Sequence, residues 1–542
     1  MSELDKKMRR VRKLARTKLG IEDLHPGQVE ALKAILSGRD TLAVMPTGSG
    51  KSAVYQLAAQ TLPGPTVIIS PLIALQHDQT ASIADHHLGE AAEVNTTIGA
   101  GERREALEEL EERELEYLFL APEQFNNDEI LARLRDAKPS LLVVDEAHVV
   151  SEWGHDFRPE YLRVGAVADA LGHPTILALT ATSSPRVRPE IVERLHLREP
   201  AIIVRGFDRP NISLAVERFH DEAVKRDALL ERVQASETPG IVYVATHRHV
   251  DDLIDGLRER GVSAVGYHGG MSAKRRGEAQ DAFMNGEADV IVATNAFGMG
   301  IDKPDVRFVY HYDIPDSVDS YFQEIGRGGR DGEPAEAVLF YRPADLGLHR
   351  FFAGGGKVDE EQMETVARAL DRHRGALSLA ELREETGLSQ AKLSTAVTSL
   401  EDAGAVETTA TGEVETVPRR KAEKASHAAV EAEERLRAFE QSRLEMMRGY
   451  AETGACRREY ILNYFGEVPE TKCAGCDVCE SGPTTVQGNH PFPLRGMVRH
   501  GVWGEGVVER YDDGTMVVLF DSVGYKTLAV DFVVESGALE LL

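Results

Sequence analysis

Short runs of aliphatic and β-branched residues recur through the first 210 residues, and each run precedes a polar stretch with helical periodicity. Near-continuous apolar strands that alternate with helices are typical of a parallel sheet buried on both faces. The pattern restarts after Asn211, so the sequence predicts two tandem α/β domains, residues 1–210 and 211–345. The runs are 41–45, 67–70, 141–144 and 176–180 in the first domain, and 240–244, 290–293 and 308–311 in the second.

The first run leads into a glycine-rich loop, 45–52, with the sequence Met-Pro-Thr-Gly-Ser-Gly-Lys-Ser. Its glycines let the backbone N–H groups converge on a phosphate at the start of a helix. Lys51 is expected to reach the β- and γ-phosphates of ATP, and the Ser52 hydroxyl to ligate Mg²⁺. Met45 stands where the strict motif has glycine, so the loop is a relaxed variant. The expected nucleotide contacts are Thr47, Gly48, Ser49, Gly50, Lys51 and Ser52.

An acidic pair, Asp145 and Glu146, follows the run 141–144, at the strand end where α/β sheets bind ligands. Asp145 is expected to hold Mg²⁺ and Glu146 to polarise the attacking water, as phosphoryl transfer requires. Far downstream, the segment 323–330 offers arginines for the charge that develops on the γ-phosphate. Its catalytic candidates are Gln323, Arg327 and Arg330. Because they belong to the second domain, they make ATP hydrolysis depend on domain closure.

All the cysteines of the chain fall between residues 456 and 479. Four thiolates at this close spacing suit tetrahedral Zn²⁺, and four protein ligands leave no open position for catalysis. In a reducing compartment such a cluster favours metal binding over disulfides. The sequence therefore predicts a structural zinc centre formed by Cys456, Cys473, Cys476 and Cys479.

These motifs, in this order, resemble the RecQ family of superfamily 2 helicases. The resemblance covers about 10–345 and resumes at 450–480. It implies two RecA-like domains and an ATP-dependent DNA helicase that moves 3′ to 5′ on single-stranded DNA and unwinds tailed duplexes. It also implies work in DNA repair or recombination. The matching segments are 26–28, 70–73, 145–148, 179–182, 207–211, 267–269, 293–301 and 323–330.

The most discriminating segment is 151–161, directly after the acidic box. It resembles the aromatic-rich loop with which RecQ enzymes couple single-stranded DNA to ATP hydrolysis. Aromatic faces stack on bases for about 1–3 kcal/mol each. Most aromatic side chains in a folded chain are core residues. The polar residues between Trp153 and Phe157, however, favour an exposed loop. The expected DNA-coupling residues are Trp153, His155, Asp156, Phe157 and Arg158.

Three positions depart from the family pattern. RecQ proteins usually carry an aromatic where this chain has Ile21 and an Arg where it has His25, both contacting adenine. Gln28 remains to read the adenine edge, so ATP is still expected, with looser base selectivity. In the arginine segment Gly328 replaces the usual Ala, which we expect to be a minor change.

The accessory parts follow an unusual order. Residues 346–418 read as a winged-helix-like segment, with helix, turn, helix and hairpin over 376–417. The second of these helices has one basic residue, Lys392, so duplex binding, packing and protein contact all stay open. A helical arm and the zinc module follow at 419–482, with a long and largely exposed helix over 420–449. RecQ proteins usually place the zinc module before the winged helix.

The tail, 494–542, follows a polar linker, 483–493, and has short alternating strands with glycine-rich turns. That pattern predicts a small β-barrel. The tail resembles the Tudor-like barrel that ends UvrD-type helicases. It is expected to dock a protein, such as RNA polymerase, or to add DNA contact. No segment resembles the helical HRDC bundle of the family.

The formal net charge of −27 disfavours non-specific adhesion to nucleic acid, but the charge of the local groove decides site-specific binding. Without a long apolar run or a secretory signal, the chain is expected in the cytoplasm, at the nucleoid and at no membrane. Two rival functions stay open. An RNA helicase would be stimulated by RNA. A DNA-binding scaffold with vestigial ATPase would have lost Lys51, Glu146 or Arg330, and all three are present.

Overall fold

The computed structural model describes two compact units, Met1–Tyr341 with Thr453–Thr484 and Arg342–Glu452 with Thr485–Leu542. The predicted DNA-coupling residues, Trp153, His155, Asp156, Phe157 and Arg158, lie outside the described residues. The described residues are 2–542 without 72, 96, 152–160, 162, 186, 299–300, 302, 348–357, 374, 403, 409–412, 418–421, 468–472, 474, 483–490, 494–495, 513 and 521.

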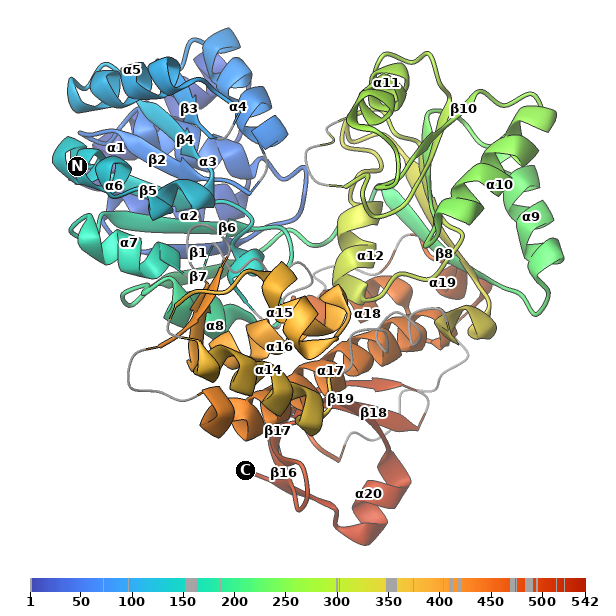
Figure 1. Cartoon of the computed structure of the whole chain (residues 1–542). Helices are drawn as coiled ribbons and strands as arrows, with labels where there is room; N and C mark the ends of the chain where they lie inside the picture. The colour runs from blue at the N-terminus through green and yellow to red at the C-terminus, as the bar shows by residue number, and fades with distance from the viewer. Residues whose placement is uncertain are drawn as a thin grey trace. The chain divides into compact units, whose positions relative to one another are not determined.

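The first domain of unit 1 contains a seven-stranded sheet in the order β3-β4-β2-β5-β6-β1-β7, with all pairings parallel. Helices cover both of its faces (Figure 1). Each apolar run predicted here forms a strand. The strands are β1 Thr41–Val44, β2 Thr66–Ile69, β3 Ala91–Val94, β4 Tyr117–Leu120, β5 Leu141–Val144, β6 Thr175–Thr180 and β7 Ala201–Val204. The helices are α1 Glu3–Leu19, α2 Pro26–Leu36, α3 Lys51–Ala59, α4 Ile73–Asp85, α5 Ala100–Glu111, α6 Asp128–Ala137, α7 Val164–Ala170 and α8 Val187–Arg194.

The second domain repeats this plan with six parallel strands in the order β10-β11-β9-β12-β13-β8. The predicted runs form β9, β11 and β12, so the prediction of two tandem parallel-sheet domains is confirmed. The strands are β8 Ile212–Arg218, β9 Gly240–Tyr243, β10 Ala264–Tyr267, β11 Val290–Ala293, β12 Phe308–His311 and β13 Ala335–Tyr341. The helices are α9 Glu222–Ala235, α10 His247–Glu259, α11 Ala273–Met284 and α12 Val318–Ile325.

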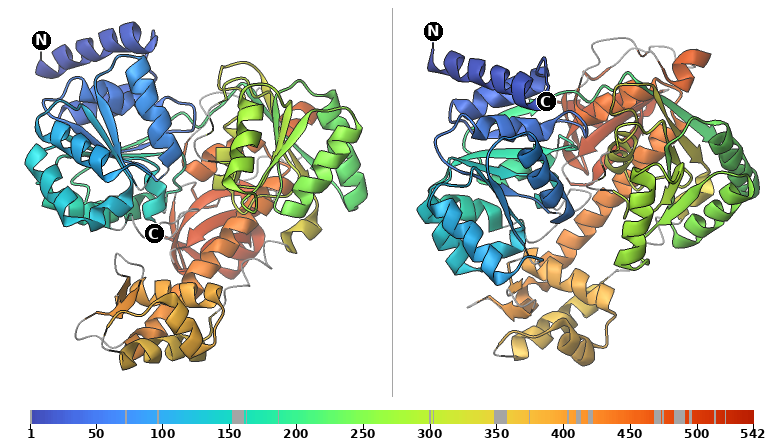
Figure 2. Two further views of the ribbon diagram at one scale, coloured as in Figure 1. Left: turned by 45° about the horizontal axis from the view of Figure 1, so that its top comes forward. Right: turned by 90° about the horizontal axis from the view of Figure 1, so that it is seen from above.

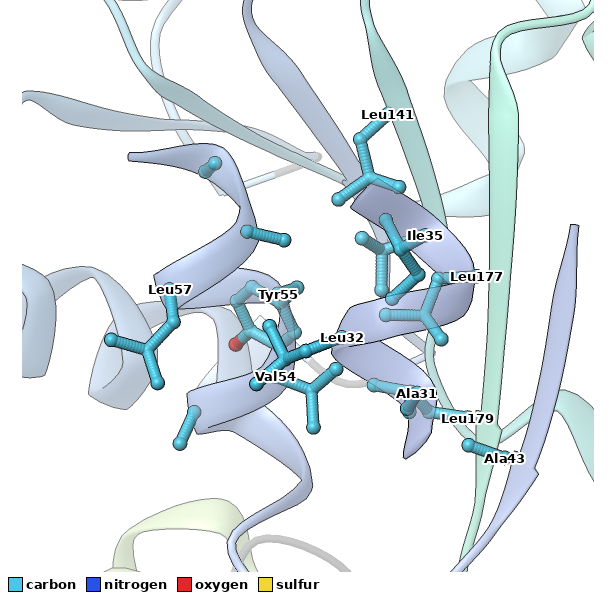
Figure 3. Close-up of a cluster of buried hydrophobic side chains, with 14 of the residues drawn as sticks. Ala31, Leu32, Ile35, Ala43, Val54, Tyr55, Leu57, Leu141, Leu177 and Leu179 are labelled. Carbon is cyan, nitrogen blue, oxygen red and sulfur yellow. The ribbon is translucent and has the colours of Figure 1, made fainter. Parts of the chain in front are cut away.

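The core of the first domain holds both ends of the glycine-rich loop. Leu32 and Ile35 of α2 are buried beside Val54 and Leu57 of α3, against apolar side chains of β5 and β6 (Figure 3). Each such aliphatic side chain contributes about 1.5–3 kcal/mol through burial. The loop between β1 and α3 is therefore anchored by a strand and a helix that cannot shift without opening the core.

Unit 2 begins with three helices and a β-hairpin over the segment predicted to be winged-helix-like. Leu393, Val397 and Leu400 of α16 share a buried face, as the periodicity indicates. The long helix α17 differs from expectation: of its described side chains, most from Phe439 to Ala451 are buried, so the prediction of an exposed helix is wrong there. The elements are α14 Glu360–Arg372, α15 Leu379–Thr386, α16 Gln390–Asp402, β14 Val406–Thr408, β15 Val414–Thr416 and α17 Ala422–Glu452.

The tail folds as a five-stranded antiparallel sheet in the order β19-β18-β17-β16-β20. This sheet covers part of α17. Gly524 of β19 lies so close to the helix that an added Cβ would clash with Ser442. Within the described part of the tail, the edge strands β19 and β20 do not pair with each other. The elements are β16 Met497–His500, β17 Gly504–Asp512, β18 Thr515–Phe520, β19 Gly524–Ala529, α20 Val530–Ser536 and β20 Leu539–Leu541.

Among the described helices, none combines the length and the apolar character needed to cross a bilayer.

Candidate nucleotide site and metal centre

The phosphate loop joins β1 to α3 at the carboxyl edge of the first sheet. Gly48 (φ +80°) and Gly50 (φ +72°) occupy the left-handed region, and Gly50 caps α3, which begins at Lys51. The free backbone N–H groups of a helix start are the donors that an anion takes up. The predicted contacts from Thr47 to Ser52 therefore lie where a phosphate chain fits the backbone.

Lys51 turns back across this loop, and its Nζ donates to the carbonyl oxygen of Met45 at 3.1 Å. Burial lowers the pKa of Lys51, and the Glu146 and Asp145 carboxylates partly offset that shift. Met45 has no positive φ, and its buried side chain lies against Gly27, where an added Cβ would be 3.0 Å from the Met45 sulfur. A side chain is therefore tolerated where the strict motif has glycine.

Gln28 braces the loop. Its Nε2 donates to the carbonyl oxygens of Ser49 at 3.1 Å and Gly50 at 3.0 Å, and its Oε1 accepts from the backbone N–H of His25 at 2.9 Å. Reading an adenine edge with this amide would require the exchange of one of these hydrogen bonds. Of the two departures at the expected adenine contacts, Ile21 packs against the core and His25 is exposed.

The acidic pair lies at the carboxyl end of β5. Burial, together with the neighbouring Glu146 carboxylate, raises the pKa of Asp145 to about 7. A divalent cation would favour the ionised carboxylate. Glu146 has a positive φ of 49° and caps the short 3-10 helix Ala147–Val150 that follows. The division of labour expected for the two carboxylates stays a prediction.

A polar link that sequence reasoning missed joins this pair to the end of β6. The Nδ1 of buried His148 lies 3.4 Å from Glu146 Oε2 and 2.9 Å from Thr180 Oγ1. The Thr180 hydroxyl in turn donates to the carbonyl oxygen of Thr182 at 2.8 Å. The segments 145–148 and 179–182 both match the family pattern, but neither segment by itself indicates that His148 contacts Thr180.

The arginine segment of the second domain lies against the phosphate loop. A Cβ built on Gly48 would be 3.5 Å from Arg330 Cγ. Arg330 and Arg327 both direct Nη1 toward the carbonyl oxygen of Ile301, at 2.9 and 3.5 Å. Arg327 is buried, whereas Gln323 lies on α12 and is partly exposed. Of the three catalytic candidates, the structure thus brings Arg330 to the loop.

Arg209 and Asn211 hold this segment in place, and neither was among the predicted site residues. Arg209 donates to the carbonyl oxygens of Gly326, Gly328 and Gly329 at 2.9–3.3 Å. Asn211 Nδ2 donates to Gly329 at 2.8 Å. The packing also accounts for Gly328, because an added Cβ would lie only 3.3 Å from the Cβ of Ala335.

The sulfur atoms of Cys456, Cys473, Cys476 and Cys479 all lie within 4.8 Å of one another. Tetrahedral Zn²⁺ with bonds of about 2.3 Å needs sulfur atoms roughly 3.8 Å apart, so this donor set fits the metal. Hydrogen bonding with Cys456 lowers the pKa of the Cys476 thiol to about 4, and a thiolate is the form that ligates zinc. The four predicted ligands are therefore positioned to hold a metal ion.

The zinc module contains α18 Arg457–Phe465 and α19 Asp477–Ser481. It also contacts the linker 205–211 between the two domains. Arg458 donates to Asp208 Oδ1 at 2.8 Å and to the carbonyl oxygens of Arg209 and Ile212 at 2.7 Å. The Glu467 carboxylate accepts from the backbone N–H groups of Gly206 and Phe207. A continuous set of contacts thus runs from the cysteines through the linker to the arginine segment.

We expect Cys476→Ser to lose the bound metal and to lower the melting temperature, because a structural zinc site contributes directly to folding. Native mass spectrometry and thermal melting of the purified chain measure both effects. The exposed neighbour substitution Ser481→Ala should keep the metal. A full zinc complement in Cys476→Ser would show that the cluster is not the metal site.

Comparison with known proteins agrees with this arrangement. Residues 25–189 match the DEAD/DEAH box helicase family, 224–332 the helicase conserved C-terminal domain, and 414–480 the RecQ zinc-binding family. Residues 358–417 match a domain of unknown function, DUF7343.

Two relatives illustrate the similarity. The probable ATP-dependent DNA helicase RecS of Bacillus subtilis is 38% identical over 354 residues, which cover 65% of this chain and 71% of the relative. The ATP-dependent DNA helicase RecQ of Pasteurella multocida is 34% identical over 472 residues, which cover 86% of this chain and 62% of the relative. This chain therefore spans less than two thirds of the length of that RecQ protein.

Among solved structures, the DEAD-box helicase Mss116 bound to ssRNA and UDP-BeF matches with a TM-score of 0.53 at 16% identity. The match covers 74% of this chain and 91% of that structure. At this identity the likeness is one of fold alone.

Proposed function

The chain belongs to the RecQ family of ATP-dependent DNA helicases, and from that premise we propose that it couples ATP hydrolysis to 3′-to-5′ movement along single-stranded DNA and to separation of tailed duplexes. The observation that carries the proposal is the approach of Arg330, from the second domain, to the phosphate loop of the first. A site shared by two domains links nucleotide hydrolysis to their relative movement.

The roles in hydrolysis follow from the residues at this site. Lys51 would bind the β- and γ-phosphates. Ser52 and Asp145 would hold Mg²⁺, which would neutralise charge on the phosphates. Glu146 orients the attacking water. Arg330 stabilises the charge that builds on the γ-phosphate as it is transferred. The site would therefore act mostly by positioning ATP and the attacking water and by stabilising charge on the transferred phosphate.

The contacts around the linker support coupling between the domains. Arg209 is held by Arg458 of the zinc module through its carbonyl oxygen, and its guanidinium holds the backbone that precedes Arg330. A shift of the linker would therefore move the arginine segment. In this proposal the zinc module keeps Arg330 in register with the phosphate loop.

DNA as the track is tested by ATP turnover with single-stranded DNA, duplex DNA, RNA or no nucleic acid, followed by strand separation on 3′-tailed and 5′-tailed duplexes. Single-stranded DNA should stimulate turnover most, and the 3′-tailed duplex should be unwound. Stimulation by RNA alone would favour the RNA helicase. Unwinding of the 5′-tailed duplex alone would reverse the polarity.

The proposed coupling loop is tested by Trp153→Ala. Loss of the stacking face should leave hydrolysis unresponsive to single-stranded DNA, because base stacking contributes about 1–3 kcal/mol per base. The chain has two tryptophans, so Trp503→Ala in the tail is the matched control and should keep the response. Full stimulation of the Trp153 variant would remove the loop from the mechanism.

We propose that the tail docks a protein partner, with RNA polymerase as the candidate. We also propose that the whole chain works at the nucleoid, in DNA repair or recombination. Exposed Val502, Phe532 and Val534 support a contact surface on the tail. Deletion of 490–542 should weaken capture of purified RNA polymerase and leave ATP turnover in place. Equal capture by both forms would remove the candidate partner.

A further inference from the structure

The N-terminal helix α1 is the most basic element of an acidic chain. It carries eight Lys or Arg and two acidic residues, whereas the whole chain has a formal net charge of −27. Global charge keeps most of this surface away from polyanions, but a local patch of opposite sign governs binding where it lies. Figure 2 shows the helix on the periphery of the first domain in both views.

One face of α1 fastens it to that domain. Met8, Val11 and Ala15 are buried in the core cluster, and Leu4 and Leu14 pack partly buried against it. This spacing is that of an amphipathic helix with a single apolar stripe. A membrane-surface helix would need the same stripe for the lipid, and here the domain core already occupies it.

The opposite face presents a row of exposed cations. Lys6, Arg9, Arg10, Arg12 and Lys13 are exposed and make no ion pair or side-chain hydrogen bond there. By contrast, Arg16 pairs with Glu22 and Asp23, and Lys18 donates to the carbonyl oxygen of His87.

The spacing of these cations is unfavourable for the helix itself. Lys6 and Arg10, and likewise Arg9 and Lys13, are like charges four residues apart, which destabilises a helix. Asp5, four residues before Arg9, offsets part of this repulsion. No ion pair or side-chain hydrogen bond of the four cations lies among the described residues. A bound polyanion would offset the repulsion between these cations.

We propose that the face formed by Lys6, Arg9, Arg10 and Lys13, hereafter the basic face, binds the phosphate backbone of duplex DNA outside the helicase site. The inference rests on the proposed DNA track. These residues stand at i, i+3, i+4 and i+7, so they line one side of the helix over about 10 Å. Duplex DNA offers one phosphate charge per roughly 1.7 Å of axis, enough to meet each cation.

Duplex fits this face better than single-stranded DNA. Proteins that bind single strands combine cations with aromatic side chains on which the bases stack. The sequence of α1 contains no aromatic residue. The contribution of the basic face to binding is therefore electrostatic, independent of base sequence and strongly dependent on salt.

The basic face is attached to the nucleotide site through the fold. α1 packs against α2 and α3, and α3 starts at Lys51. A duplex held there would stay fixed to the first domain while the second moves. The expected benefit is a longer residence on tailed duplexes at the same rate of ATP turnover.

The test replaces the four residues together by Lys6→Gln, Arg9→Gln, Arg10→Gln and Lys13→Gln, because glutamine keeps high helix propensity. A matched variant replaces four exposed basic residues elsewhere in the domain, Arg104, Arg113, Arg135 and Lys138, by glutamine. Dissociation constants for a blunt duplex are measured from low to high salt. At about 0.9 per phosphate contact, the basic-face variant should lower the slope of log Kd against log salt by about 3.6, and the matched variant should leave it near the parent value.

Further measurements separate the explanations. Arg9→Lys with Arg10→Lys should keep the parent slope, since either cation neutralises a phosphate, and equal melting temperatures exclude misfolding. An unchanged slope in the glutamine variant overturns the proposal. Loss of binding to phosphatidylserine vesicles with unchanged duplex binding also overturns it, in favour of a membrane. The parent's ATP turnover with single-stranded DNA tests the helicase proposal separately, because it does not depend on the basic face.

Discussion

Replacement of Lys51 by alanine is expected to lower ATP turnover by at least about 100-fold, with or without DNA, and to abolish unwinding. Lys51 Nζ donates to the Met45 carbonyl oxygen and lies in the field of Asp145 and Glu146, at the start of α3. Removal of the ammonium takes away the side-chain cation that is expected to bind the β- and γ-phosphates. Steady-state phosphate release and strand separation on a 3′-tailed duplex measure the loss.

DNA binding should persist in Lys51→Ala, because the loop is expected to contact nucleotide and not DNA, and the core around α3 does not depend on the ammonium. Fluorescence anisotropy with a labelled single strand checks this. Lys33→Ala is the matched control, since Lys33 is an exposed lysine on α2 of the same domain. Turnover near the parent value in Lys51→Ala would contradict the assignment of the whole nucleotide site.

The second large effect is expected from Arg330→Ala. An arginine that stabilises the transferring phosphoryl group raises kcat by about 10³-fold or more, so kcat should fall by that order. KM for ATP should change little, because the guanidinium contributes mainly in the transition state. Arg330→Lys should recover only part of the rate, since an ammonium lacks the planar fork of the guanidinium.

Arg327→Ala provides the comparison. Arg327 is buried, and an added Cβ on Gly298 would lie 3.7 Å from its Nη2, so it packs within the second domain. We expect Arg327→Ala to lower the melting temperature, with a smaller effect on kcat once folded protein is compared. If Arg327→Ala lost more of kcat than Arg330→Ala, the roles of the two arginines would be exchanged.

Local features of the chain were readable from the sequence. The glycine-rich loop, the acidic pair and the apolar strands each depend on residues that are close in the chain. Gly48 and Gly50 adopt the positive φ values that the motif requires. The cysteine spacing by itself likewise indicates a metal site, because few other arrangements explain such a cluster.

Features that join distant segments were not readable. The exposed helix expected over 420–449 proved mostly buried in its described C-terminal half, because β19 packs on it some eighty residues later in the chain. Periodicity reports which residues share a face of a helix, but it does not report what covers that face. The same limit applies to α1, where only the packing of Met8, Val11 and Ala15 shows that the basic face is the exposed one.

The sequence by itself determined the two parallel-sheet domains, the phosphate loop and the zinc ligands, because hydrophobic period, backbone conformation and ligand spacing are local properties. Only the tertiary structure decided that Arg330 is the one of the three catalytic candidates that approaches the loop. It alone also shows that Arg209 holds the arginine segment and that Arg458 of the zinc module holds the linker. These contacts join residues more than 100 positions apart. Their partners are chosen by the packing of whole domains, and no motif encodes that choice in advance.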